Sequence, residues 1–551
     1  MSEPTQVVTR ASAAVLDALN NPRLSLLKNI LLVVFLHQAA RQAYRLVFVR
    51  GVSASWQQFS KELIKWSIKI IRATVPGVDA KIKKEIEKAV KSIESKNAPD
   101  VPGEVKYLTL PTEGLTDGVL RGELRRYKGL ESDEWKSGKI SGAIYHSVES
   151  LNQLTTETYG MFGLANPLHP EVFPSVRKME AEVIAMVLNM HHAPAEACGS
   201  VTSGGTESLL MAVKTYRDMA RELRGVTEPE MVVPVTIHVA FDKAAQYFGV
   251  RIIHIPVDPV TFQVDVRKMD RAINRNTIMI AGSTPNYPYG TMDDIPALGR
   301  LAEKHKVPFH VDNCLGSFLT THLEKAGLPV PYLIDFRVPQ VTSISCDTHK
   351  YGFAPKGTSV LMYRSKEIRN YQYFFQTEWP GGIYASPSTA GSRAGSLIAC
   401  CWTTLLSLGE RGYIEATKQI VGNAHKIADG IRSIPLLQVM GTPYSSVVAF
   451  QSADDTKLSI YGVADLLSKR GWHLTVLQFP KAIHIACTLL TTDETVATLL
   501  KDIREVIDIL EKNPEAGNGE IAAIYGSAAT VPDRTVVSDI CKGFLDSLTK
   551  A

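Results

Sequence analysis

The sequence predicts an α/β protein built on a mostly parallel sheet that is wrapped by helices. Between about residues 160 and 400, short apolar runs alternate with helical patterns. Residues 278–283 form a continuous apolar run typical of a buried strand, residues 294–305 have helical spacing, and residues 307–312 predict the next strand. Two more strands are expected at 341–345 and 359–363. Strands that alternate with helices favour a parallel sheet covered on its faces.

The regions on either side of this alternation have different patterns. We expect residues 1–75 to form an N-terminal extension, and residues 76–160 to form a helical segment that leads into the sheet. The alternating region itself predicts a large domain at 161–405. After it, strands become fewer and helices longer, so residues 406–551 are expected to form a smaller α+β C-terminal domain.

The N-terminal extension carries features typical of membrane-associated segments. An uncharged apolar stretch at 29–40 lies within a candidate membrane helix at about 24–48. A cationic amphipathic stretch follows at 60–71, as in helices that lie at a membrane surface. Crossing the hydrocarbon takes about 20 apolar residues, which is more than the uncharged stretch supplies. A membrane span, a surface helix and a buried helix therefore stay open as alternatives.

The composition argues against several classes of function. Hydrophobic residues make up 45% of the chain and charged residues 21%, an ordinary globular mixture. The net charge is only +4 and no basic stripe is interleaved with aromatic residues, so no nucleic-acid partner is expected. The seven cysteines are irregularly spaced and contain no CxxC pair. We therefore expect no metal site, no disulfide framework, and thiols that stay reduced in the cytosol.

Three motifs carry residues suited to ligand binding or catalysis. Gly205 and Thr206 lie in a small-residue turn before a helical run, where backbone N–H groups and the helix dipole favour an anion. Asp312 ends a predicted strand, and such strand ends line the usual ligand crevice. Lys350 follows another strand, where a lysine can form a Schiff base with a carbonyl. Each motif also has an ordinary explanation as a turn, a helix cap or a solvated loop lysine.

Together, the three motifs fit one cofactor, pyridoxal phosphate (PLP). This cofactor needs a lysine for its aldehyde, an acid for its ring nitrogen and a cradle for its phosphate. The order of cradle, Asp312 and Lys350, with the last two 38 residues apart, is the order found in fold-type-I PLP enzymes. The sequence therefore predicts a PLP enzyme in which Lys350 forms the Schiff base.

Longer segments resemble the sphingosine-1-phosphate lyase family, within the group II PLP-dependent decarboxylase-like enzymes. The similar segments are 201–208, 240–245, 345–357, 381–387 and 390–393, within a resemblance from about residue 100 to the C-terminus. The resemblance implies a fold-type-I PLP-dependent transferase-like fold. It also implies a retro-aldol cleavage of the C2–C3 bond of a phosphorylated sphingoid base, which gives a long-chain aldehyde and phosphoethanolamine.

The resemblance further implies a set of residues around the cofactor. Lys350 binds PLP, Asp312 pairs with the ring nitrogen, and His238 stacks on the ring. The residues expected around the phosphate groups are Gly205, Thr206, His349 and Ser392.

The residues that the resemblance assigns to the substrate come from several segments. Lys356 is expected to face the substrate, and Lys356 and Tyr145 are both candidates for proton transfer. Tyr145, Asn166 and His169 are expected to enter the site from the partner subunit of a homodimer. Either Tyr287 or Tyr289 joins them, and the sequence does not decide which.

Location and function follow from the same resemblance, with rival functions kept open. The related lyases lie on the endoplasmic reticulum membrane with the catalytic part in the cytosol, and we expect the same location here. One rival is a PLP-dependent amino-acid decarboxylase, which uses the same cofactor to break a different bond. The other is a non-catalytic membrane scaffold, against which the intact set of Lys350, Asp312 and Gly205 argues.

Overall fold

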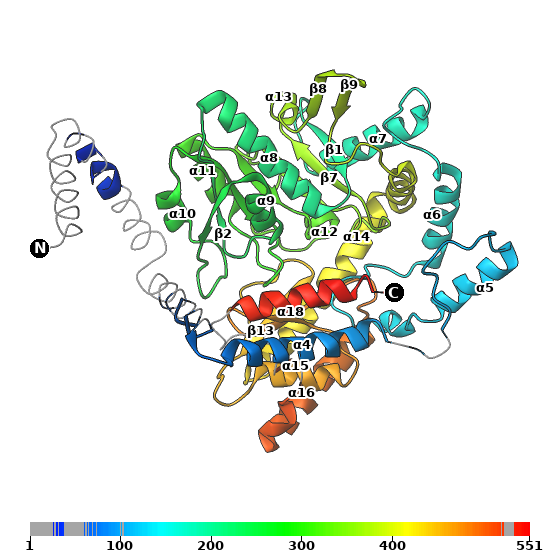
Figure 1. The fold of residues 1–551 in the computed structure, drawn as a ribbon, viewed down its shortest axis with the longest axis vertical. Helices are drawn as coiled ribbons and strands as arrows, with labels where there is room; N and C mark the ends of the chain where they lie inside the picture. The colour runs from blue at the N-terminus through cyan, green and yellow to red at the C-terminus, as the bar shows by residue number, and fades with distance from the viewer. Residues whose placement is uncertain are drawn as a thin grey trace, which may run out of the picture. The chain divides into compact units, whose positions relative to one another are not determined.

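Figure 1 shows the fold in a computed structural model of the chain. The structure describes residues 74–99, 104–519 and 534–550, together with residues 101 and 521–522 and scattered positions between 26 and 72. It divides into two compact units, Met1–Glu62 and Leu63–Ala551. The elements named below belong to the second unit.

A seven-stranded sheet forms the centre of this unit, in the order β1-β7-β6-β5-β4-β2-β3. Its strands are β1 Cys198–Thr202, β2 Glu230–Pro234, β3 Arg251–Ile255, β4 Thr277–Ser283, β5 Phe309–Asp312, β6 Ser343–Cys346 and β7 Ser359–Tyr363. The pairs β2–β3, β2–β4, β4–β5 and β5–β6 are parallel, whereas β7 runs antiparallel to both β1 and β6. The predicted mostly parallel sheet is confirmed, and β1 points the same way as β5 and β6.

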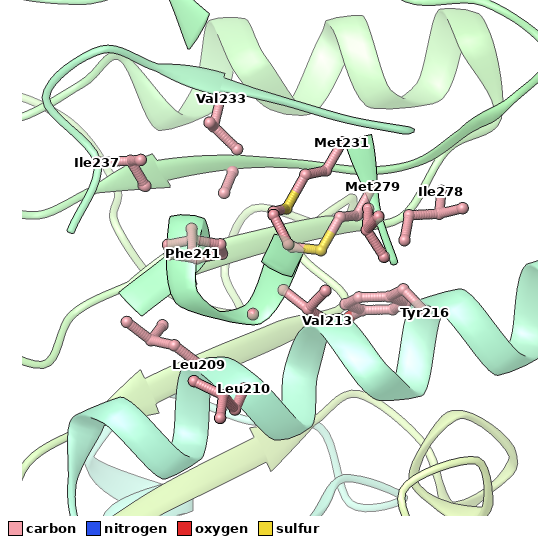
Figure 2. Close-up of a cluster of buried hydrophobic side chains, with 14 of the residues drawn as sticks. Leu209, Leu210, Val213, Tyr216, Met231, Val233, Ile237, Phe241, Ile278 and Met279 are labelled. Carbon is pink, nitrogen blue, oxygen red and sulfur yellow. The ribbon is translucent and has the colours of Figure 1, made fainter. Parts of the chain in front are cut away.

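The helices that connect these strands pack against the sheet. They are α8 Gly205–Arg224, α9 Ala240–Phe248, α10 Val266–Ala272, α11 Ile295–His305, α12 Ser317–Thr320 and α13 Lys366–Asn370. Figure 2 shows how α8 is held: Leu209, Val213 and Tyr216 project at helical spacing toward Met231 of β2 and Met279 of β4. These side chains are 1% exposed or less, so the apolar face of α8 fixes where the helix begins.

Helices and a short antiparallel sheet complete the unit. The helical segments before the sheet are α4 Val78–Asn97, α5 Asp117–Lys128, η2 Asp133–Ser137, α6 Glu149–Phe162 and α7 Pro174–Met190. A hairpin, β8 Phe374–Trp379 and β9 Gly382–Ser386, leads into α14 Gly395–Arg432. The C-terminal elements are β10 Leu437–Val439, β11 Val447–Ser452, α15 Ile460–Ser468, β12 Thr475–Leu477, β13 Ala482–Ala486, α16 Asp493–Lys512, η3 Pro514–Gly517 and α18 Arg534–Ser547.

The long helix α14 runs across the predicted boundary between residues 405 and 406. It kinks at Gly409, whose φ of 59° and ψ of 178° are not helical. Beyond it, strands β10 to β13 form an antiparallel sheet in the order β10-β11-β13-β12, which agrees with a C-terminal α+β part. The boundary itself stays a prediction.

The first and last long helices of this unit, α4 and α18, lie side by side (Figure 1). A Cβ at Gly543 of α18 would lie 2.4 Å from a methyl group of Val90, so the two helices approach closely. The Asn97 amide also donates to Ser547 Oγ at 2.8 Å. The first helix of the segment predicted at 76–160 therefore packs on the C-terminal helix.

The structure describes only part of the candidate membrane helix at about 24–48. Residues Leu32–His37 are helical, and the large apolar side chains from Leu32 to Leu36 are about half or more exposed. No helix among the described residues is both long and apolar enough to cross a bilayer. Most of residues 24–48 lies outside the described part of the chain.

Three fully buried histidines make this fold sensitive to acid. Burial lowers the pKa of His191, His310 and His484 to about 4 each. An unfolded histidine has a pKa near 6.5, so the unfolded chain takes up these protons first as the pH falls. The stability that the neutral rings contribute is present above about pH 6.5 and is lost as the pH drops toward 4.

We expect each of these histidines to cost about 2 kcal/mol of stability at pH 5 relative to pH 7. Thermal unfolding measured at both pH values should therefore show a large fall in the midpoint for the parent. His191→Gln should show a smaller fall, because glutamine does not titrate. The control is His473→Gln, at a side chain that is 53% exposed. Equal falls for His191→Gln and the parent would contradict the assignment.

Candidate active site

The three motifs meet at one edge of the sheet, because β1, β5 and β6 run in the same direction. The turn before α8 follows β1, Asp312 ends β5, and Lys350 follows β6. The turn before α8 and the loop that carries Lys350 line a cavity of about 370 Å³. Its lining residues are Ser203, Gly204, Gly205, Thr206, Glu207, Leu209, His238, Cys314, Asp347, His349 and Lys350.

The start of α8 is pressed against the loop that carries Lys350. A Cβ at Gly205 would lie 2.7 and 2.8 Å from the two carboxylate oxygens of Asp347, and 3.0 Å from Cys314 Sγ. Only glycine fits this position without moving its neighbours. Glu207, one turn later, accepts the Ser203 N–H at 2.7 Å and the Thr389 N–H at 3.0 Å. It thereby ties the turn to the loop after β9.

Lys350 forms a buried ion pair that the sequence analysis did not predict. Its Nζ lies 2.8 Å from Asp347 Oδ2, and the Asp347 side chain is 1% exposed. Burial acts to lower the pKa of Lys350, but the Asp347 carboxylate outweighs it and the pKa is raised. Burial likewise acts to raise the pKa of Asp347, but Lys350 and then His349 lower it. The spacing of three residues between Asp347 and Lys350 was the signal for this contact.

Asp312 is buried at the end of β5 and is oriented by neighbouring donors. Its Oδ1 accepts the Cys314 N–H at 3.1 Å and lies 3.5 Å from Ser345 Oγ. Two residues earlier on the strand, the His310 ring lies 2.7 Å from Ser343 Oγ and 3.2 Å from Ser345 Oγ. Because burial lowers the pKa of His310 to about 4, this ring is neutral near pH 7.

Two histidines line the same cavity. His238 Nδ1 accepts the N–H of Ala240, the first residue of α9, at 3.2 Å. His349 Nε2 lies 3.8 Å from Asp347 Oδ2. The Nδ1 atom of His349 and the Oδ1 atom of Asp347 are both buried, and no described atom forms a hydrogen bond with either. Two polar atoms at the cavity thus have unused capacity for hydrogen bonds.

Tyr145 lies beside the Lys350 loop within its own chain, although the resemblance leads us to expect it from a partner subunit. Its ring packs edge-on against Tyr351 at 4.8 Å, next to Lys350 in the sequence. Burial raises the pKa of Tyr145 to about 12, against a weaker opposite effect of Lys350. Lys356 extends over the same ring, with Nζ 4.4 Å from the centroid, and donates to His349 O at 3.3 Å. The sequence identified Tyr145 as a candidate site residue but did not show which subunit supplies it to the site.

The structure separates the two tyrosines between which the sequence left the choice open. Tyr289 is 6% exposed, packs against Phe262 and donates to the carbonyl of Phe479 at 2.5 Å, so it belongs to the core. Tyr287 is 46% exposed and lies edge-on to His484 at 5.0 Å. It is also close enough to Tyr145 to affect the pKa of that phenol. Tyr287 is therefore the better candidate for the substrate.

Asn166 and Ser392 lie together beside the cradle, whereas His169 does not. The Asn166 amide donates to Ser392 Oγ at 3.1 Å. Ser392 lines a second cavity, of about 240 Å³, which shares Ser203 and Glu207 with the first. His169 is exposed, and its described side-chain contact is with Glu171, at 3.4 Å. Within one chain, no described contact joins His169 to Lys350.

Comparisons with known proteins show which family the chain belongs to. The family model for the pyridoxal-dependent decarboxylase conserved domain matches residues 135–453. The chain is 43% identical over 541 residues to the sphingosine-1-phosphate lyase of Saccharomyces cerevisiae, covering 96% of this chain and 90% of that protein. The chain belongs to the sphingosine-1-phosphate lyase family.

Solved structures agree with membership of the lyase family. The sphingosine-1-phosphate lyase of Burkholderia pseudomallei is 37% identical, with a TM-score of 0.74, over 82% of this chain and 98% of that chain. A glutamate decarboxylase of Lactobacillus brevis has a TM-score of 0.64 over 74% of this chain and 96% of its own, at 19% identity. The second likeness shows the shared fold alone.

PLP is the cofactor of this lyase family, and the residues of the cavity fit it. The amine of Lys350 is available for its aldehyde, and the buried carboxylate of Asp312 for its ring nitrogen. The helix N-terminus at Gly205 and Thr206, with the unpaired Nδ1 of His349, suits its phosphate. His238 lines the cavity that would hold the ring. These individual roles remain proposals.

We expect Tyr287→Phe to impair catalysis and Tyr289→Phe to impair only stability. Loss of the Tyr287 hydroxyl should lower kcat/KM for the family reaction by about tenfold, the equivalent of one hydrogen bond to a reacting group. Loss of the Tyr289 hydroxyl should leave the kinetics unchanged and cost about 1 kcal/mol of stability. Steady-state kinetics and thermal unfolding of both variants decide the matter. A kinetic defect in Tyr289→Phe alone would reverse our choice.

Proposed function

We propose that this chain cleaves the C2–C3 bond of a phosphorylated sphingoid base, releasing a long-chain aldehyde and phosphoethanolamine. The observation that carries the proposal is a second cationic group, Lys356, held over Tyr145 beside the cofactor lysine. A substrate with its own phosphate needs a positive group besides those that hold PLP, because a dianion is costly to desolvate without one. Family membership supports the same reaction.

The residues would divide the chemistry as follows. When bound, PLP supplies an electron sink for the bond that breaks next to the substrate amine. Lys350 holds the cofactor and yields its place to the substrate amine. Asp312 keeps the ring nitrogen protonated, because a buried carboxylate favours a positive charge beside it. Tyr145 and Lys356 are the candidates to take up the proton of the C3 hydroxyl.

Product identification tests this reaction against the decarboxylase alternative. Purified protein with PLP is given a phosphorylated sphingoid base, and phosphoethanolamine and aldehyde are quantified. Common amino acids are given in parallel, and carbon dioxide is measured. We expect phosphoethanolamine and aldehyde in equal amounts and no carbon dioxide. Carbon dioxide release without phosphoethanolamine would establish the decarboxylase.

We expect Lys356→Ala to retain PLP and to lose about 100-fold or more in lyase activity, since one charge-assisted contact to phosphate is worth roughly 2–3 kcal/mol. The variant should keep PLP because Lys350, Asp312 and Gly205 are untouched. PLP retention is read from the absorbance of the purified variant. Lys366→Ala, at an exposed lysine of α13, is the matched control and should keep full activity. A fully active Lys356→Ala would refute the phosphate contact.

We also propose that the chain forms a homodimer in which His169 of the partner subunit completes each site. The exposed side chain of His169, which has no described contact with Lys350 of its own chain, supports the proposal. Mixing inactive Lys350→Ala with impaired His169→Ala chains should then restore up to about a quarter of parental activity, since half of the random dimers keep one intact site.

Tyr145 provides the matched control for this subunit-mixing experiment. Because Tyr145 lies beside Lys350 within one chain, each hybrid of Lys350→Ala with Tyr145→Phe carries a defect in both of its sites. That mixture should recover no activity, whereas the mixture with His169→Ala should recover some. Recovery with Tyr145→Phe but not with His169→Ala would reverse the assignment of the two residues.

We propose further that the N-terminal region holds the chain on the endoplasmic reticulum membrane, with the catalytic part in the cytosol. The exposed apolar side chains from Leu32 to Leu36 and the exposed Trp66 support membrane contact. Removal of residues 1–75 should abolish sedimentation with microsomes and leave PLP binding intact. A truncated protein that still sediments with microsomes would exclude this anchor.

A further inference from the structure

The ion pair between Asp347 and Lys350 has a role that PLP binding alone does not require. We propose that Asp347 is a positioning residue that holds the amine of Lys350 as a fixed ammonium whenever the amine is not bonded to the cofactor. Once released and protonated, Lys350 would then act as a proton donor and could not take the proton of the substrate hydroxyl. The inference rests on PLP as the family cofactor and holds whichever bond the enzyme breaks.

The surroundings of Asp347 leave Lys350 as its counterion. The two atoms lie 2.8 Å apart, and the carboxylate is almost fully enclosed. The next cationic candidate, His349 Nε2, is 3.8 Å away, and burial lowers the pKa of that histidine, which favours its neutral form. A buried carboxylate without a partner is strongly unfavourable, so the carboxylate keeps Lys350 charged.

The carboxylate is also held in place, so it fixes where the Lys350 amine lies. Ser317 Oγ donates to the backbone carbonyl of Asp347 at 2.7 Å. On the other side, the start of α8 touches the carboxylate at Gly205, where a Cβ would come within 2.8 Å of both oxygens. The backbone of Asp347 is therefore anchored, and the start of α8 closes one side of its carboxylate, which favours return of the amine to the same position.

This arrangement assigns the two lysines of the site opposite tasks. A displaced Lys350 beside Asp347 is an ammonium and has no free electron pair with which to take the proton of a substrate hydroxyl. Lys356 lies on the other side of Tyr145, and partial burial followed by repulsion from Lys350 lowers its pKa. The candidates for the proton acceptor are therefore Lys356 and Tyr145, and the proton donor is Lys350.

The experiment measures the protonation of Lys350 directly, in cofactor-free protein. Trace labelling with acetic anhydride at a series of pH values, followed by peptide mass spectrometry, gives a titration midpoint for each lysine. The Lys350 side chain is 23% exposed, so the reagent reaches it. Burial slows labelling equally at every pH, whereas protonation moves the midpoint, so the midpoint is the readout. The parent should show a higher midpoint for Lys350 than for Lys356.

The decisive variant is Asp347→Asn, which keeps the shape of the side chain and removes its charge. We expect its Lys350 to label about tenfold or more faster at pH 8, because each unit by which the pKa falls raises the neutral fraction tenfold. The matched control is Asp312→Asn, which removes a buried carboxylate at the end of β5 and should leave the Lys350 midpoint unchanged. Equal midpoints in Asp347→Asn and the parent would overturn the proposal.

Two further measurements keep the test decisive if Asp347→Asn folds poorly. Asp347→Glu retains the charge, so its Lys350 midpoint should stay above that of Lys356 in the same protein. PLP uptake by the cofactor-free parent, followed by absorbance, should accelerate steeply with pH, because capture needs a neutral amine. Uptake that is insensitive to pH, or a Lys350 midpoint at or below that of Lys356 in the parent, would refute the proposal. None of these readouts depends on the substrate, so they are independent of the lyase assignment.

Discussion

The arrangement of the site depends on one enclosed negative charge. The Asp347 carboxylate lies behind the start of α8 and is almost without solvent, so its neighbours must be either small or positive. Gly205 satisfies the first requirement and Lys350 the second. Because α8 is fixed by its own apolar face against β2 and β4, the glycine cannot retreat from the carboxylate. The start of α8 and the amine of Lys350 thereby lie against the same carboxylate.

Patterns along the chain were sufficient to predict the scaffold. The apolar runs that predicted strands at 278–283 and 359–363 correspond to β4 and β7, because side chains buried on both faces leave a continuous apolar signal. Gly205, Asp312 and Lys350 could be found for a related reason. Each follows or ends a strand, and parallel strands deliver their ends to the same edge. Local sequence patterns were therefore sufficient to predict the strands and the residues at their ends.

The remaining parts of the site depend on contacts between distant segments, which spacing does not reveal. Tyr145 was expected from another subunit, yet it packs against Tyr351 of its own chain, more than 200 residues later. Tyr287 and Tyr289 are equivalent in sequence, and their burial and packing in the fold distinguish them. Asp347 was visible beside Lys350, but its enclosure depends on Gly205 and Ser317, which come from other strands' loops.

The loop after β6 is also fastened to segments that follow the seven-stranded sheet in the chain. The hydroxyl of Tyr351 donates to the carbonyl of Cys487 just beyond β13, and that of Tyr413 on α14 donates to the carbonyl of Gly352, both at 2.8 Å. Hydrogen bonds to two later segments thus flank Lys350. A crossover between the genes of two relatives at residues 353–412 would combine the loop of one protein with both later segments of the other. Such a chimaera keeps the bond to Gly352 only if its α14 carries a tyrosine at the position of Tyr413.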